Sequence, residues 1–126
     1  MRSCASATRS FVEAALRDGE AQLAWETAQA AEQELLGSDL WLLLAEGRQA
    51  THPADAVAVY QRVADEVLEK TDRRAYAAAV RILKRARDAA KAADDLESFS
   101  QHIATLREQQ RRRPTMIAML DKAGLR

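Results

Sequence analysis

The stretch from residue 52 to residue 70, HPADAVAVYQRVADEVLEK, constrains the fold of this chain more than any other. Its Pro53 suits the first position of a helix, because proline has a pre-set φ and lacks the amide hydrogen that would be unpaired there. Thr51 or His52 then falls at the cap, and Asp55 lies in the first turn, where the helix dipole favours a carboxylate. The sequence therefore predicts a helix over residues 52–70.

This helix has an apolar face about 180° wide, against the ~100° typical of a surface helix. At 100° per residue, apolar side chains form two adjacent stripes and charged side chains fill the remaining sector. The stripes are Ala56, Tyr60, Val63 and Val67, and beside them Val57, Ala64 and Leu68, with Val59 on the shoulder. A face this wide needs neighbours on two sides, so we expect an inner helix of a stack. Tyr60 is expected in the core, with a polar partner for its hydroxyl.

The rest of the chain also favours helix over strand, since 48% of its 126 residues are hydrophobic and it holds only 4 Gly and 2 Pro. Ser10 and Glu13 form a capping-box pattern for a short first helix that carries Phe11 on its apolar face and that Gly19 ends. A second helix is expected from about Glu20 to Leu35. It carries Ala24, Ala28 and Ala31 on one stripe beside Trp25.

Four more helices are predicted from caps and apolar periodicity. One begins at a Ser38 cap, contains the Leu40–Ala45 run and frays after Gly47. The next helix covers residues 73–93 and is capped by Thr71 or Asp72. Asp94 with Glu97 begins another helix, which carries the narrow apolar stripe Leu96, Phe99, Ile103 and Leu106. A short last helix begins at Pro114 and is ended by Gly124.

Seven helices joined by short turns predict an all-α fold in which consecutive helices are antiparallel. Ala56–Tyr60–Val63 has the spacing of the second helix of a tetratricopeptide repeat, but Ala24, Ala56 and Phe99 recur at uneven intervals. We therefore expect an irregular, tetratricopeptide-like stack of three helical hairpins closed by a short helix. Residues 1–9 are expected as a flexible tail, and residues 10–126 as a single helical-repeat-like domain.

The charge is divided unevenly along a chain whose formal net charge is zero. Residues 1–69 hold five Lys/Arg against twelve Asp/Glu, whereas residues 70–126 hold fourteen against seven. Such asymmetry indicates a partner-binding surface, contact between the two halves of one molecule, or self-association between the acidic half of one copy and the basic half of another.

The basic half predicts a candidate partner or nucleic-acid surface on the outward side of the 73–93 helix and beyond it. Its members are Arg73, Arg74, Arg81, Lys84, Arg85, Arg111 and Arg112, with Arg87, Lys91, Arg107 and Arg113 beside them. Clustered cations neutralise phosphates, so nucleic acid is one candidate ligand. The alternative is a solvated helix face that pairs with the acidic half.

Residues of the kind that carry catalysis or bind metal are scarce. His52 and His102 are fifty residues apart, so a cap or an exposed flanking position is the simpler interpretation of each. Cys4, the one cysteine, has no sequence cue for a lowered pKa. We therefore predict no enzyme, no cofactor and no metal site.

A reducing, cytoplasmic location is expected, because one cysteine cannot form an internal disulfide. The longest uncharged apolar run, Leu40–Ala45, is far shorter than the ~20 residues of a membrane span. The N-terminus lacks an apolar core of signal-peptide length.

One resemblance covers about residues 20–125. It is carried by Trp41, the HPADA of 52–56, Tyr60, Tyr76 with Ala79 and Val80, Phe99, Leu106-Arg107 and the closing LDKAGL of 120–125. With these residues the chain resembles the helical C-terminal region of bacterial SWIM zinc-finger family proteins and a related uncharacterised domain family.

The resemblance implies a tetratricopeptide-like scaffold with no established reaction. It does not bring the zinc site, which needs Cys-x-Cys and Cys-x-His pairs that this sequence lacks. The chain is then either a C-terminal piece of a longer protein or a stand-alone relative. The sequence predicts a non-enzymatic scaffold for a protein partner, and the alternative is a nucleic-acid-contacting accessory domain.

Overall fold

The computed structural model describes residues 2–31 and 37–125, with side chains from residue 7 onward. The described residues form seven helices and no strand, which confirms the all-α prediction. The helices are α1 (Arg2–Arg17), α2 (Ala21–Ala30), α3 (Gly37–Gln49), α4 (Pro53–Val67), α5 (Arg73–Ala92), α6 (Leu96–Gln109) and α7 (Pro114–Lys122).

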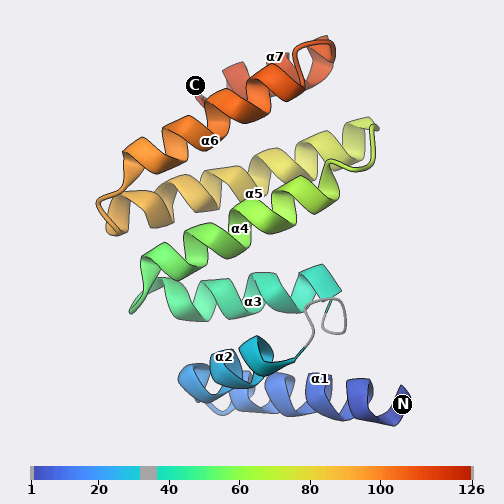
Figure 1. Ribbon diagram of the computed structural model, residues 1–126, viewed down its shortest axis with the longest axis vertical. Helices are drawn as coiled ribbons and strands as arrows, with labels where there is room; N and C mark the ends of the chain where they lie inside the picture. Colours follow the sequence, from blue (N-terminus) through green and yellow to red (C-terminus); the bar gives the residue numbers. More distant parts are fainter. Residues whose placement is uncertain (1, 32–36, 126) are drawn as a thin grey trace.

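The helices follow one another along the long axis of the molecule, from α1 at one end to α6 and α7 at the other (Figure 1). Consecutive helices run in opposite directions, as their short turns require. Contacts also join α1 to α3 and α5 to α7. The most extensive contact is between α4 and α5, which belong to different predicted hairpins.

The α4 helix lies between α3 and α5, as its wide apolar face predicts. Pro53 occupies the first helical position, and His52 is the N-cap residue, although its side chain makes no capping hydrogen bond. Tyr60 is completely buried, and its hydroxyl donates a hydrogen bond to Oε1 of Gln49 at 3.1 Å. The other buried residues of α4 are Ala56, Val59, Val63 and Ala64.

The α5 helix buries one side along its whole length. Its N-cap is Asp72, whose carboxylate accepts a hydrogen bond from the Ala75 amide at 2.8 Å, as the sequence predicts. The buried side consists of Ala75, Tyr76, Ala79, Val80, Ile82, Leu83, Ala86, Ala89 and Ala90. Alanine at five of these nine positions lets α4 and α6 approach closely.

Two tryptophans join the first hairpin to the rest of the stack. Trp25 of α2 and Trp41 of α3 meet edge to face, with ring centroids 6.1 Å apart and planes at 90°. The guanidinium of Arg48 lies 4.9 Å from the Trp25 centroid, and that of Arg62 on α4 lies 4.5 Å from the Trp41 centroid. Three successive helices are thus linked by one row of stacked side chains.

The N-terminus differs from its prediction. The α1 helix begins at Arg2, so residues 2–9 are helical, and Ser10 lies inside the helix and does not cap it. Residues 2–9 contain no Gly or Pro to stop a helix. Arg9 pairs with Glu13 one turn later at 2.8 Å and with Asp39 of α3 at 2.8 Å, contacts that favour the helical form of this segment. Phe11, expected on the apolar face, is 48% exposed.

The boundary between α5 and α6 is also different. Asp94 does not cap α6 but has a φ of 55°, and the Asp95 amide donates to the Ala90 carbonyl at 2.9 Å, which closes the C-terminus of α5. The N-cap of α6 is Asp95. Leu96, one residue into α6, is 41% exposed and does not join the buried stripe of Phe99, Ile103 and Leu106.

Two further boundaries concern α2 and α3. Ser38 lies inside the first turn of α3, which begins at Gly37, so the cap predicted at Ser38 is wrong. The α2 helix ends at Ala30, and residues 32–35 of the predicted second helix lie outside the described residues. In the part of the chain that the structure describes, no helix has the length and apolar character needed to cross a membrane.

We predict that Trp41→Ala destabilises the fold by about 3–5 kcal/mol, because a buried indole is lost together with its contacts to Trp25 and Arg62. Urea unfolding followed by circular dichroism measures this change. Leu43→Ala on the same helix is the control, since Leu43 is 53% exposed, and we expect it to change stability by less than about 0.5 kcal/mol. Equal losses in the two variants would contradict the role given to Trp41.

Candidate interaction surface

The seven predicted basic residues are all exposed, but they do not form one patch. Arg74, Arg81 and Arg85 recur at spacings of seven and four and therefore share one stripe of α5, with Lys84 beside it. Arg73 lies in the first turn of α5, and Arg111 and Arg112 lie in the turn between α6 and α7. The structure thus brings together Arg74, Arg81, Lys84 and Arg85 on α5, and places Arg111 and Arg112 on a separate turn.

Two other arginines of the basic half hold the C-terminus in place. Arg87 donates to the carbonyls of Ala123 and Gly124 at 3.3 and 3.4 Å. Arg107 donates to the Leu125 carbonyl at 3.0 Å and pairs with the Asp121 carboxylate at 2.6 Å. Because their donors bind these carbonyls, Arg87 and Arg107 contribute less to an outer ligand surface than their charge suggests.

A groove between α1 and α3 has a volume of about 700 Å³. Asp39, Leu43 and Glu46 recur at spacings of four and three, so they share the exposed side of α3. Leu43 stands in this groove with 53% of its surface exposed. The groove is lined by Glu13, Leu16, Arg17, Leu40, Leu43, Glu46 and Gly47. Leu43 belongs to the Leu40–Ala45 run, in which every residue is apolar, so the sequence gives no sign that this one side chain stays exposed.

Carboxylates surround the groove. Glu46 makes no ion pair with any described residue, whereas Glu13 pairs with Arg9. Asp39 also pairs with Arg9, whose hydrogen bond lowers the pKa of the Asp39 carboxyl. With Arg17 as the one cation in the lining, the groove combines an apolar floor with an acidic edge.

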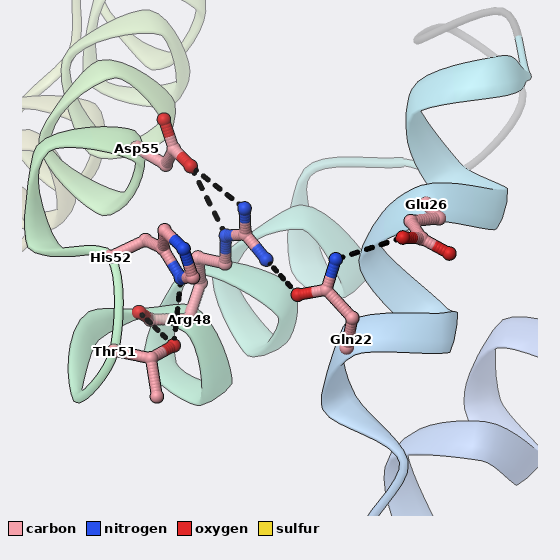
Figure 2. Close-up of polar contacts among 6 residues, drawn as sticks. All are labelled: Gln22, Glu26, Arg48, Thr51, His52 and Asp55. Carbon is pink, nitrogen blue, oxygen red and sulfur yellow. Dashed lines mark hydrogen bonds and ion pairs between the residues drawn. The ribbon is translucent and has the colours of Figure 1, made fainter.

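Arg48 forms a polar junction of three helices (Figure 2). Its Nε and Nη2 both reach Oδ2 of Asp55 at 3.1 Å, and its Nη1 donates to Oε1 of Gln22. Gln22 in turn donates to Oε1 of Glu26 at 2.9 Å. The Arg48 side chain is only 11% exposed, and its guanidinium also stacks on Trp25. The arrangement fixes α2 and α4 against α3.

The histidines do not form a site with other reactive groups. Nδ1 of His52 lies 3.0 Å from the hydroxyl of Thr51 in the same turn (Figure 2). Nε2 of His102 on α6 lies 3.6 Å from Oδ1 of Asp65 on α4. Burial raises the pKa of Asp65, and the nearby His102 acts in the opposite direction. Among the side chains that the structure describes, no group of three His, Cys, Asp or Glu could hold a metal ion.

Tyr60 connects the core to the basic stripe of α5. Burial raises the pKa of the Tyr60 hydroxyl, and the positive charge of Arg85 partly opposes this effect. Arg85 therefore lies near the Tyr60–Gln49 hydrogen bond, at the junction of α3, α4 and α5. The hydroxyl remains protonated at neutral pH, so it serves as a hydrogen-bond donor and not as a base.

Comparison with known proteins adds no relative. No protein-family model, no curated protein and no solved structure matches this chain.

We predict that Arg48→Lys destabilises the protein by about 1–3 kcal/mol, because lysine cannot make the forked contact with Asp55 while also reaching Gln22. Thermal unfolding followed by circular dichroism measures the loss. Arg17→Lys is the matched control, since Arg17 is exposed and has no ion pair among the described residues. If neither substitution changes the stability, the forked contacts of Arg48 contribute nothing to stability beyond its positive charge.

Proposed function

We propose that this protein is a cytoplasmic, non-enzymatic helical scaffold of tetratricopeptide-like architecture that binds an amphipathic helix of a protein partner. The observation that carries the proposal is the groove between α1 and α3, where Leu43 is half exposed on an otherwise well-buried framework. An exposed leucine inside a groove offers an anchor for an apolar side chain of a partner helix.

The groove also indicates the chemistry of the partner. Its floor of Leu16, Leu40 and Leu43 suits aliphatic side chains, and its edge carries Glu13 and Glu46. Helix-in-groove recognition uses apolar anchors at i, i+3, i+4 and i+7 with complementary charges beside them. We therefore expect a partner helix with leucine-like anchors on one face and Lys or Arg along its flanks.

The resemblance of residues 20–125 to the helical region of SWIM zinc-finger family proteins supports a scaffold with no reaction of its own. The basic helix that binds in the groove could belong to a different protein or to a second copy of this chain, since residues 70–126 carry fourteen Lys/Arg against seven Asp/Glu. Sedimentation velocity over a range of concentrations tells a self-associating protein from one that needs a different partner.

The test uses three labelled peptides: an amphipathic Leu/Lys helix, the same peptide with Glu for Lys, and a scrambled Leu/Lys peptide. We expect the first to bind best by fluorescence anisotropy, and Leu43→Arg to weaken it about tenfold or more by placing a charge on the apolar floor. Leu96→Arg is the matched control, because Leu96 is 41% exposed on α6, away from the groove. Equal binding of the three peptides, or equal effects of the two variants, would rule out this groove.

A second candidate function rests on a separate observation. Arg81, Lys84 and Arg85 are exposed on adjacent turns of α5, and none of them pairs with a carboxylate among the described residues. Unpaired cations on a helix face favour contact with phosphates. On this basis the alternative is a nucleic-acid-contacting accessory domain.

Gel-shift titrations at low salt test this alternative. The triple variant Arg81→Glu, Lys84→Glu, Arg85→Glu should abolish binding, and each lost phosphate contact should reduce the salt slope by about 1. A charge-matched comparison uses the double variant Arg81→Glu, Arg85→Glu and the control Arg17→Glu, Lys70→Glu, whose residues lie on α1 and after α4. If both double variants weaken binding equally, net charge and not the α5 stripe is responsible.

A further inference from the structure

The side of the stack on which α5 begins contains a second pocket, distinct from the α1–α3 groove. Here the turn between α4 and α5 and the turn between α6 and α7 lie on the same side of the stack (Figure 1). Arg113 of the second turn donates a hydrogen bond to the Tyr76 hydroxyl of α5 at 3.1 Å, which ties the two together. The pocket has a volume of about 410 Å³ and is lined by Thr71, Arg73, Tyr76, Arg113, Pro114 and Thr115.

The charge of this pocket is uncompensated. It is lined by two guanidinium groups and by no carboxylate. Neither Arg73 nor Arg113 makes an ion pair with any described residue, whereas Arg111 nearby pairs with Glu108 at 3.1 Å. The hydrogen bond to Tyr76, whose ring is buried, steadies the Arg113 side chain and leaves most of its five N–H donors for a ligand.

Neutral donors add to the two cations. Thr71 of the α4–α5 turn and Thr115 of the first turn of α7 also line the pocket, and each carries a hydroxyl. The α7 helix starts at the pocket with Pro114, and no side chain caps its first turn. Its N-cap residue is Arg113, which has no acceptor oxygen in its side chain to satisfy the free amides of that turn. The free backbone amides in the first turn of α7 therefore favour an anion in this pocket, as the two arginines do.

We propose that this pocket binds a phosphate monoester carried by a protein partner, such as a phosphoserine or phosphothreonine side chain. A monoester carries a charge of about −1.5 to −2 at neutral pH, which matches two guanidinium groups, whereas a phosphodiester carries only one negative charge. The volume leaves room for the side chain that carries the phosphoryl group.

A nucleic-acid end is the less suitable source of the same group. Single-stranded recognition needs an aromatic face on which a base can stack. The pocket has one aromatic residue, Tyr76, and it is only 7% exposed. The assignment of the phosphate to a protein partner rests on the proposed scaffold function. The affinity of the pocket for a phosphoryl group is independent of that proposed function.

The test is an NMR titration of the ¹⁵N-labelled protein with a Gly/Ser-rich phosphoserine peptide, its unphosphorylated twin and a 5′-phosphorylated dinucleotide. We expect the phosphopeptide to shift the amides of Thr71, Arg73 and Thr115, and to bind more tightly as pH rises through about 6, where the monoester loses its second proton. The unphosphorylated twin should shift none of them. Shifts spread over the whole molecule, or equal binding of the twin, would overturn the proposal.

Variants locate the site. Arg73→Gln should weaken phosphopeptide binding about tenfold, because it removes one charge-assisted hydrogen bond to the phosphate. We expect the same effect from Arg113→Gln. The Arg73 side chain makes no hydrogen bond or ion pair with a described residue, so we expect its substitution to leave the fold intact even if Arg113→Gln does not. Arg112→Gln is the charge-matched control in the same turn, and an equal loss there would overturn the site.

Two more outcomes complete the design. Tighter binding of the dinucleotide than of the phosphopeptide would overturn the assignment to a protein partner. Leu43→Arg should leave phosphopeptide binding unchanged, because the α1–α3 groove lies at the other end of the stack. A failure of this proposal is therefore distinguishable from a failure of the groove proposal.

Discussion

The stack depends on the row formed by Arg48, Trp25, Trp41 and Arg62. These four side chains come from α2, α3 and α4, and they are the largest groups that link the first hairpin to the middle of the molecule. Nε of Arg62 is buried without a hydrogen-bond partner, and its desolvation is offset in part by stacking on Trp41 and by the Glu66 carboxylate 3.9 Å away. Elsewhere α2 contributes to the core mainly through Ala24 and Ala28, whose small side chains bury little apolar area.

This central row leaves the two ends of the stack free to differ in chemistry. At the first end, Arg9 joins α1 to α3 through Asp39, and the groove beside them keeps Leu43 and Glu46 exposed. At the other end, arginine side chains bind backbone carbonyls and close the chain on itself. Long basic side chains there replace the apolar contacts that a longer terminal helix would make, since α7 has only nine residues.

Sequence patterns were most informative where a helix is enclosed by its neighbours. The residues of the two stripes predicted for α4 are buried or partly buried, because this helix lies between α3 and α5. The patterns were misleading at the edges. Ser10 and Glu13 satisfy a capping pattern inside a helix that simply continues, and Asp94 resembles an N-cap but adopts the left-handed conformation that ends α5. Leu43 and Leu96 fit apolar stripes yet stay exposed, because no neighbouring helix covers them.

In the basic half of the chain, the sequence likewise does not show which charges are available to a ligand. Its net charge of +7 follows from the sequence, but the charge available to a ligand depends on contacts that join residues far apart in the chain. Arg107 reaches Leu125 and Arg87 reaches Gly124, so both cations stabilise the C-terminus. Arg73 and Arg113 are forty residues apart, and only the meeting of two turns makes them line one pocket. Local patterns could identify the cations; the fold decides which of them hold the structure together and which remain for a partner.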